Sequence, residues 1–408
     1  MASSVDSASF EIFCACAPGL EPILLEEVRA LGLSGTAQAG GVSLHGGAHE
    51  LLLLNLWLRT AGRVLVRLGT FRATTFPELV KRAGELPLAR VLRAGAPVAL
   101  RATCRKSRLY HSGAVIERVH AALEAKLGRK SPLVRAATDA EEALADESFD
   151  PTAEVAAEKT RKPAPRAASQ LILIRFENDQ CTISADASGA LLHRRGYRTQ
   201  LSHAPLRETL AAGLLLSVGY RGGALLDPCC GGGTIPIEAA LVAMNRAPGI
   251  SRSFACESWP GIAAALVAEL RDQARNMERP LSLDPRDAIV GSDLDPRAIS
   301  AAQANAQAAG VAAAVQFSVR ALESWKASEL PASALLIANP PYGKRVGSPG
   351  PELTALWSKL GALARAHQGC AAFLCPSSDL VRIAGAPLRA EIRTQNGGLP
   401  ISMLLSRR

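Results

Sequence analysis

The stretch that most constrains the fold of this chain is a short apolar run that stops at two prolines. Residues 335–338 are Leu-Leu-Ile-Ala, followed by Asn339, Pro340, Pro341 and Tyr342. A short apolar run bounded by turn residues predicts a buried strand of a parallel sheet. Consecutive prolines cannot continue the ladder of hydrogen bonds, and they hold the preceding residue extended. The pattern therefore predicts that Asn339, Pro340 and Tyr342 stand at the carboxyl end of a strand, where open α/β sheets bind ligands.

This group of residues suits a planar amine. The Asn339 side-chain oxygen and the Pro340 carbonyl can each accept a hydrogen bond from an exocyclic NH₂ group. The Tyr342 ring offers a face on which a base can stack, an interaction worth about 1–3 kcal/mol. The alternative interpretation is a strand followed by a proline turn and a core tyrosine, with no function.

A second strand end carries a glycine-rich loop. Residues 224–226 predict a buried strand, residues 227–234 read Asp-Pro-Cys-Cys-Gly-Gly-Gly-Thr, and a helix is expected over 235–244. Glycines let the backbone approach a ligand closely, and a loop between strand and helix is where a nucleotide-like cofactor binds. No Gly-Lys-Ser/Thr follows, and the loop lacks the G-x-G-x-x-G fingerprint. The cofactor contacts expected here come from Asp227, which suits a cationic group, and from Pro228, Cys229, Gly231, Gly233 and Thr234.

A third strand end, after residues 288–291, carries acidic residues. Asp293 ends this strand, and an acidic residue at that place is the usual partner of ribose hydroxyls. We assign Asp293 and its neighbour Leu294 to the cofactor site. Asp295 precedes Pro296 and is expected to be the N-cap of a helix that continues to Ala308. Residues 245–286 must then form an elaborated crossover between the helix expected over 235–244 and the strand expected over 288–291.

Sequence patterns divide the 408 residues into three parts. Residues 1–68 predict an α+β lobe, residues 69–188 a second α+β block, and residues 189–408 a doubly wound α/β domain with a mostly parallel sheet. Residues 135–168 lose large apolar side chains and predict a flexible insertion. In the first two parts, strands are expected over 10–15, 42–44, 64–68, 98–102, 171–176 and 181–185, and helices over 21–31, 48–58, 76–83 and 112–127.

Cationic residues and tyrosines gather in two stretches, and the net charge of the chain is +9. A basic balance favours a polyanion such as nucleic acid. We predict phosphate contacts and base stacking from both stretches. The first, between a strand and a helix, contains Arg101, Arg105, Lys106, Arg108, Tyr110 and His111; the second contains Arg194, Arg195, Tyr197 and Arg198. A solvated basic loop without a partner is the alternative.

The nine cysteines show no C-x-x-C spacing, so we expect no zinc site and no other metal. Reduced thiols in a cytoplasmic protein are the expected state. Residues 1–9 lack the pattern of a secretory signal, and the apolar run 51–58 is too short to span a bilayer. No membrane partner is therefore expected.

Together the motifs resemble a known family. Asp-Pro-x-Cys-Gly-Gly-Gly-Thr, Gly-Ser-Asp-Leu-Asp-Pro and Asn-Pro-Pro-Tyr-Gly are similar to the class I methyltransferases that act on exocyclic amines with S-adenosyl-L-methionine. Residues 192–198, 204–212, 245–249 and 254–260 narrow the resemblance to the THUMP-domain RNA guanine-N2 methyltransferases, which include the bacterial large-subunit ribosomal RNA enzyme. Ala17-Pro-Gly-Leu-Glu21 and residues 106–111 resemble the ferredoxin-like and THUMP segments of that family.

The resemblance implies a class I (Rossmann-like) methyltransferase domain with a seven-stranded, mostly parallel sheet, preceded by ferredoxin-like and THUMP domains. It implies S-adenosyl-L-methionine as cofactor and N2 methylation of a guanosine in RNA, with ribosomal RNA favoured over transfer RNA. Asn339, Pro340, Pro341 and Tyr342 would be the catalytic residues, with Asn339 also beside the cofactor, and Asn339→Ala would abolish methyl transfer. Arg320 stands where many relatives have an acid near the adenine. The resemblance also implies that a further methyltransferase domain found downstream in some relatives is absent.

Three other functions stay open at this point. A methyltransferase for DNA adenine or protein glutamine would share Asn-Pro-Pro-Tyr, but it would not need the basic segments in the first half. A non-enzymatic RNA-binding assembly factor would not need the glycine loop or Asn339. A nicotinamide oxidoreductase fits poorly, because Asp227-Pro-Cys-Cys interrupts the dinucleotide fingerprint.

Overall fold

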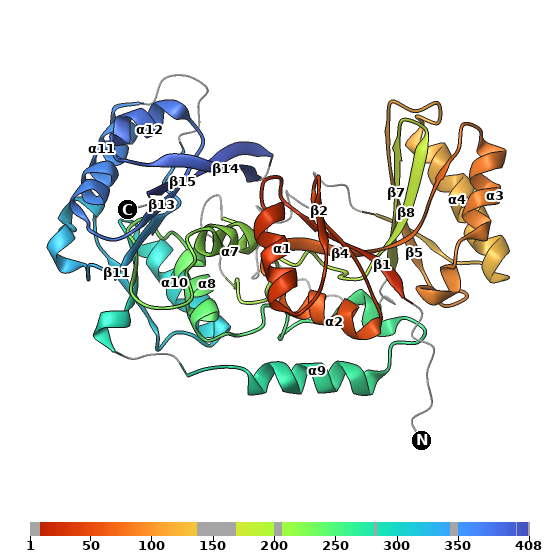
Figure 1. Ribbon diagram of the computed structural model, residues 1–408, viewed down its shortest axis with the longest axis horizontal. Helices are drawn as coiled ribbons and strands as arrows, with labels where there is room; N and C mark the ends of the chain where they lie inside the picture. The colour runs from red at the N-terminus through yellow and green to blue at the C-terminus, as the bar shows by residue number, and fades with distance from the viewer. Residues whose placement is uncertain are drawn as a thin grey trace, which may run out of the picture.

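The computed structural model describes residues 9–136, 169–199, 206–280, 284–342, 350–396 and 398–406. The predicted insertion at 135–168 lies almost wholly outside these residues. The chain forms two sheets, each with its own helices (Figure 1). None of the described helices is long and apolar enough to cross a bilayer.

The first sheet has eight strands in the order β2-β3-β1-β4-β8-β7-β5-β6. Its strands are β1 (Phe10–Cys16), β2 (Thr36–Gln38), β3 (Gly41–Gly46), β4 (Ala61–Arg72), β5 (Val98–Arg105), β6 (Leu133–Arg135), β7 (Gln170–Glu177) and β8 (Gln180–Asp186). Its helices are α1 (Glu21–Ala30), α2 (Ala48–Trp57), α3 (Phe76–Glu85) and α4 (Ser112–Leu127). Every strand and helix predicted for this half is present.

The long strand β4 joins the first two predicted parts into one sheet. Its first residues pair with β1, for example Ala61 with Cys16, and its last residues pair with β8, up to Arg72 with Gln180. The boundary predicted at residue 68 therefore falls inside a continuous strand. The apolar alternation of residues 64–68 does not continue in phase, because the strand pairing shifts register between Arg67 and Gly69, yet the strand runs on to Arg72.

The β7–β8 hairpin turns at Asn178 and Asp179, whose φ angles are +51° and +63°. Asparagine and aspartate tolerate this left-handed conformation better than most residues, and two-residue hairpins with two positive φ angles match the twist of the strands. The Asp179 carboxylate also accepts a hydrogen bond from the Arg108 backbone N–H at 2.8 Å. The hairpin thus fixes the loop between β5 and α4.

The second sheet has seven strands in the order β11-β10-β9-β12-β13-β15-β14, of which only β15 runs against the others. The strands are β9 (Leu225–Asp227), β10 (Ile289–Asp293), β11 (Val315–Val319), β12 (Leu335–Ala338), β13 (Ala371–Cys375), β14 (Arg389–Asn396) and β15 (Leu399–Ser406). The helices are α7 (Glu208–Ser217), α8 (Thr234–Ala243), α9 (Ala264–Asn276), α10 (Pro296–Ala309), α11 (Pro351–Ala366) and α12 (Ser378–Ala384). The predicted seven-stranded, mostly parallel sheet is confirmed.

Strand β12 is buried on both faces, as its apolar run predicted. Leu335 and Ile337 belong to the core that α7, α8 and α10 cover, whereas Leu336 and Ala338 belong to the core under α11 and α12. This alternation is the period-two geometry of a strand with helices on both sides. All four residues are at most 6% exposed.

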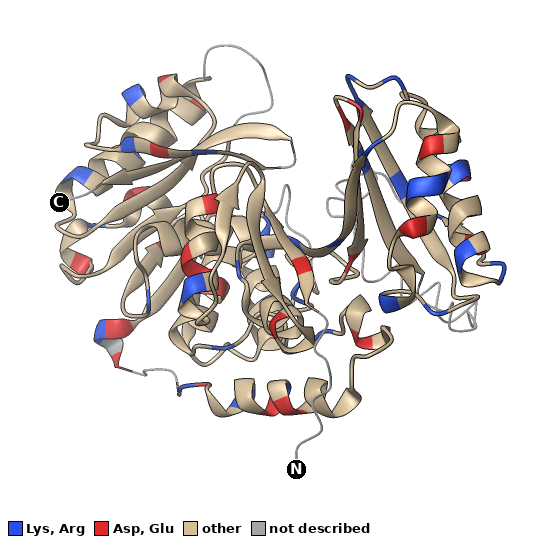
Figure 2. Ribbon diagram, turned by 45° about the vertical axis from the view of Figure 1, so that its right-hand side comes forward, with Lys and Arg blue, Asp and Glu red and all other residues tan. Residues whose placement is uncertain are grey.

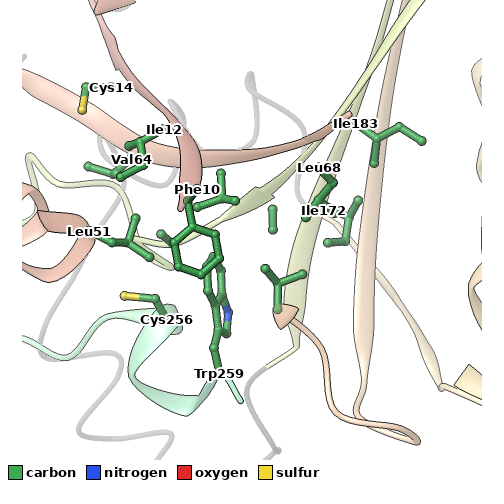
Figure 3. Packing of buried hydrophobic residues seen from close by; sticks show 14 of the residues in the cluster. Phe10, Ile12, Cys14, Leu51, Val64, Leu68, Ile172, Ile183, Cys256 and Trp259 are labelled. Carbon is green, nitrogen blue, oxygen red and sulfur yellow. The ribbon is translucent and has the colours of Figure 1, made fainter. Parts of the chain in front are cut away.

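The two halves interlock through the crossover between β9 and β10. Trp259 from this crossover packs edge to face on Phe10 of β1, with ring centroids 6.3 Å apart, and its indole N–H donates to Gln170 Oε1 at 2.6 Å (Figure 3). Cys256 is buried in the same core. In the other direction, Leu20 of the first half is fully buried in the core of the second. The length of the crossover predicted an elaboration, but not that its side chains complete the core of the other sheet.

Candidate active site

Three predicted site residues follow three adjacent strands of the second sheet. Strand β9 lies between β10 and β12, with Asp227 opposite Gly291 on one side and Leu226 opposite Leu336 on the other. Because all three strands run in the same direction, Asp227, Asp293 and Asn339 stand at one edge of the sheet. The cofactor residues and the Asn-Pro-Pro-Tyr segment are therefore neighbours.

The glycine loop after β9 is held by its own backbone. Cys229 N–H donates to Asp227 Oδ1 at 3.1 Å, Cys230 N–H to the Ser292 carbonyl at 2.9 Å, and Gly231 N–H to Asp293 Oδ2 at 3.0 Å. The Asp293 carboxylate also accepts from Asp295 N–H at 3.0 Å. Asp293 thus ties the loop to the end of β10, and each of its oxygens keeps acceptor capacity for a further donor.

Two glycines are required by close packing behind this loop. A Cβ at Gly291 would lie 2.7 Å from Phe317 of β11. A Cβ at Gly233, whose φ is +82°, would lie 2.9 Å from both Phe317 and Ala302 of α10. Gly233 is also the N-cap of α8, followed by the buried Thr234. The run of glycines is therefore explained in part by packing against neighbouring elements.

Asp227 is 1% exposed. Burial, the greatest influence, and the charge of nearby Asp293 together raise the pKa of the Asp227 carboxyl to about 8, against the opposing hydrogen bond from Cys229 N–H. A cation that binds beside a buried acid of this kind stabilises the ionised form of the acid. Pro228 beside it is buried, and Cys229 is half-buried.

In the Asn-Pro-Pro-Tyr segment, the tyrosine contacts the asparagine. The Tyr342 hydroxyl donates a hydrogen bond to Asn339 Oδ1, and the Tyr342 ring packs against the core on the α7–α8 side. Burial raises the pKa of the Tyr342 hydroxyl above its ordinary value. Pro340 is buried, whereas Pro341 is exposed. The oxygen predicted to accept from an amine therefore already has a protein donor in this structure.

Two apolar side chains are exposed at the same sheet edge. Leu294 is 74% exposed, and Val319, which pairs with Asp293 across β10 and β11, is 55% exposed. Sequence reasoning included Leu294 but missed Val319, since the terminal residue of a strand gave no signal of its own. Such an exposed pair suits a flat apolar ligand surface.

Arg320 directly follows β11, as expected. Its guanidinium stacks on the Trp325 ring at 3.5 Å and donates to both carboxylate oxygens of Glu329 at 2.9 Å. The Trp325 indole N–H donates to Ser292 Oγ of β10 at 2.9 Å. Arg320 is thereby held in a cluster beside the site. Asp295 is the N-cap of α10, as predicted, and accepts from Arg297 N–H at 2.9 Å.

The first cationic stretch lies on the lobe that carries α3 and α4 (Figure 2). Arg101 and Arg105 belong to β5 and not to a loop, because β5 pairs with β7 as far as Arg105 and Glu177. Lys106, Arg108, Tyr110 and His111 follow in the loop, and Tyr110 is 79% exposed. The His111 ring accepts from Ala114 N–H at 3.0 Å and thus caps α4.

The second cationic stretch is mostly buried, which contradicts the prediction that Arg195 and Tyr197 contact RNA. Arg195 donates to the carbonyls of Leu192 and Arg59, each at 2.6 Å. The Tyr197 hydroxyl donates to Glu238 at 3.1 Å. Both residues are 5% exposed, because the stretch runs between the two halves of the molecule.

Arg198 and Arg194 differ from these two residues. The Arg198 guanidinium lies 3.1 Å from the buried Glu208 carboxylate and donates to the Leu206 carbonyl at 2.7 Å, and its side chain is 15% exposed, so the RNA contact predicted for it stays a prediction. Arg194 is exposed, and its RNA contact stays a prediction. All nine cysteines are unpaired. In the described ranges, no three His, Cys, Asp or Glu side chains form a cluster suited to a metal ion.

Two family models match parts of the chain. The model of the RMKL-like methyltransferase domain matches residues 195–386, and the model of the RlmL ferredoxin-like domain matches residues 11–65. The ribosomal RNA large subunit methyltransferase K/L of Syntrophotalea carbinolica is 34% identical over 408 residues, which cover 97% of this chain and 53% of that protein. The chain thus spans about half the length of this curated relative.

Two solved structures are similar over nearly the whole chain. A predicted N6-adenine-specific DNA methylase from Listeria monocytogenes is 30% identical, with a TM-score of 0.77 over 97% of this chain and 96% of that one. SMU.472, assigned as a methyltransferase and crystallised with SAH, is 27% identical, with a TM-score of 0.80 over 98% of this chain and 99% of that one. The similarity therefore includes both sheets and their connection.

Proposed function

We propose that this chain, whose residues 195–386 match the RMKL-like methyltransferase domain and whose class I methyltransferase fold follows a ferredoxin-like segment, methylates RNA. The proposed reaction moves a methyl group from S-adenosyl-L-methionine to the exocyclic amine, N2, of a guanosine, and it releases S-adenosyl-L-homocysteine and one proton of the amine. Large-subunit ribosomal RNA is the proposed substrate, because the 34% identical relative is a ribosomal RNA large subunit methyltransferase. The activity would take place in the cytoplasm, where ribosomal RNA is found in bacteria.

One observation carries this proposal: Asp227, Asp293 and Asn339 end three adjacent parallel strands at one edge of the sheet. The side chains at this edge fit S-adenosyl-L-methionine. Asp227 suits its amino group, Asp293 its ribose hydroxyls, and the exposed Leu294 and Val319 its adenine. The glycine loop, from Pro228 to Thr234, supplies a close backbone approach. When bound, the cofactor supplies an electrophilic methyl group.

The residues of the Asn-Pro-Pro-Tyr segment would hold the target amine. The amine of guanine is conjugated and weakly nucleophilic. Asn339 Oδ1 and the Pro340 carbonyl would accept its two hydrogens and aim the nitrogen lone pair at the methyl group, and such alignment supplies much of an enzyme's acceleration. Asn339 Oδ1 accepts from the Tyr342 hydroxyl in the structure, and its second lone pair can accept from the amine when the base binds. In this proposal the Tyr342 ring stacks on a base extruded from its helix.

The lobe of β5, β7, β8, α3 and α4 would bind RNA as a THUMP domain. Its support is the exposed set Arg105, Lys106, Arg108 and Tyr110, which combines phosphate-binding cations with one stacking ring. Arg194 is a further phosphate contact in this proposal.

The test is methyl transfer by the purified chain to total RNA and to DNA, followed by mass spectrometry of the nucleosides. N2-methylguanosine in RNA supports the proposal, whereas N6-methyladenine in DNA would replace it. RNA from a deletion strain, separated into ribosomal and transfer RNA, then identifies the substrate. Asn339→Ala should be inactive and still bind SAH, while Asn276→Ala, an exposed asparagine of α9, serves as the matched active control.

The raised pKa of Asp227 adds a second test. Binding of a cationic amino group requires the Asp227 carboxylate to be ionised, so SAH affinity should rise with pH up to about 8, the pKa of this group. Calorimetry in buffers of different ionisation enthalpy should then detect proton release at pH 7. Asp227→Asn should bind weakly at every pH.

A further inference from the structure

The buried side-chain amide of Asn305 connects the glycine loop to residues 187–199, the linking segment between the two halves. Asn305, on α10, is 3% exposed. Its Nδ2 donates to the Gly232 carbonyl at 3.0 Å, and its Oδ1 accepts from Thr199 N–H at 2.9 Å. The side chain therefore bonds simultaneously to the cofactor loop and to the last described residue of the linking segment.

The linking segment is itself anchored in the first half. Arg195 donates to the Arg59 carbonyl at 2.6 Å, and Tyr197 donates at 3.1 Å to Glu238 of α8, the helix that the glycine loop starts. A series of polar contacts thus runs from the first half, through the backbone of residues 195–199, to Asn305. A series of this kind can transmit a shift of the segment to the glycine loop.

The hydrogen bond from Asn305 to the Gly232 carbonyl lies next to a close packing contact between the loop and α10. Gly233, the next residue, leaves no room for a Cβ against Ala302, which lies one turn before Asn305 on α10. The hydrogen bond holds the Gly232 carbonyl towards α10. If this hydrogen bond were lost, the Gly232 carbonyl could rotate towards the ligand. The loop would then present a hydrogen-bond acceptor in place of a backbone N–H donor.

We propose that Asn305 is a positioning residue for cofactor binding, which fixes the shape of the glycine loop and ties it to the segment between the two halves. The proposal rests on the function proposed above. Asn305 does not touch the ligand in this assignment. It acts through the Gly232 carbonyl.

The main test is the dissociation constant of SAH for the full chain, measured by calorimetry. Asn305→Asp retains the acceptor for Thr199 N–H and, when ionised, lacks the donor for Gly232. We expect an affinity loss of about tenfold, the usual effect of removing one hydrogen bond and leaving its buried partner unpaired. The KM for S-adenosyl-L-methionine should rise by a similar factor, with the KM for RNA unchanged.

Asn55→Asp is the matched control. Asn55 is 1% exposed, its Nδ2 donates to the Leu51 carbonyl at 2.8 Å, and its Oδ1 accepts from Ser188 Oγ at 2.7 Å. The substitution therefore removes the same kind of bond at the same burial, but in the first half. It should lower the melting temperature as Asn305→Asp does, while changing SAH affinity by less than twofold.

Two further readouts separate positioning from simple destabilisation. Protonation of the carboxylate introduced by N305D would restore a donor, so the affinity ratio between wild type and N305D should shrink at low pH. Hydrogen exchange of the amides from Gly231 to Thr234, measured without ligand, should be faster in N305D but not in N55D. Wild-type SAH affinity in N305D, or an equal loss in N55D, would overturn the proposal. A wild-type chain that binds no SAH would refute the proposed function, and the hydrogen exchange would still decide the role of Asn305 in the loop.

Discussion

The two cationic stretches of this chain have similar compositions and opposite environments. Tyr110, in the loop after β5, is 79% exposed, whereas Tyr197, in the segment between the halves, is 5% exposed. Arg108 has a side chain that is 73% exposed, while that of Arg195 is 3% exposed. Cations next to a tyrosine thus indicate an RNA surface only where the chain is not enclosed between two packed halves. The predictions that follow test whether the first stretch binds RNA and the second holds the molecule together.

The largest effect is expected from Arg195→Ala. Removal of this guanidinium leaves the carbonyls of Leu192 and Arg59 without this donor, and it removes the positive charge whose Nε lies 3.6 Å from the Glu238 carboxylate. Loss of one partner of a buried ion pair typically lowers the free energy of unfolding by about 3–5 kcal/mol. Chemical denaturation measures it, with Arg108→Ala as the exposed control, for which we expect a change within about 0.5 kcal/mol. A stable R195A protein that binds RNA weakly would instead return Arg195 to the RNA surface.

A pH effect should follow from the buried partner of Arg198. Burial raises the pKa of the Glu208 carboxyl to about 7, against the opposing charge of Arg198, and in the described part of the chain Glu208 Oε2 has no hydrogen-bond donor. An acid with a raised pKa binds its proton more tightly in the folded state. Its stabilisation is therefore complete below its usual pKa of 4.5 and is lost as the pH rises through about 7.

The shift corresponds to about 3 kcal/mol across this pH range. The buried Asp186 and the half-buried Glu27 also have raised pKa values, so each contributes in the same direction as Glu208. Glu208→Gln isolates the contribution of one group, since its stability should depend less steeply on pH than that of the wild type. Equal slopes in the two proteins would mean that folding does not shift the pKa of Glu208.

The different environments of the two cationic stretches show which features the sequence could predict. Local patterns predicted the helix over 112–127 to the residue, the Asp295 N-cap and the strand ends that bear Asp227, Asp293 and Asn339, because each depends on neighbouring residues. The burial of Arg195 and Tyr197 depends on the Glu238 carboxylate and the Arg59 carbonyl, which are distant in sequence. The same holds for Trp259, whose partner Phe10 lies in the other half. Contacts of this kind leave no local pattern to detect.

Tyr110→Ala tests the exposed member of the tyrosine pair. If the Tyr110 ring stacks on a base, its removal should weaken RNA binding by about 1–3 kcal/mol, with the free energy of unfolding unchanged. Tyr110→Phe retains the ring and should bind RNA as the wild type does. Fluorescence anisotropy with a ribosomal RNA fragment measures both. A loss in Y110F as large as in Y110A would assign the effect to the hydroxyl and exclude stacking.

The smallest effect expected from a single variant, and the one that separates the stretches most sharply, is the salt dependence of RNA binding. Each cation that contacts a phosphate adds about one counterion to the number released on binding, so its removal should reduce the slope of log K against log salt by roughly 1. Arg105→Gln and Lys106→Gln should each do so, and the double variant should reduce the slope by roughly 2. Arg286→Gln, which replaces an arginine whose side chain is 86% exposed in the second half, should leave the slope unchanged. Arg194→Gln then decides where the RNA surface ends: a reduced slope extends that surface to the start of the linking segment, and an unchanged slope confines it to the lobe of α3 and α4.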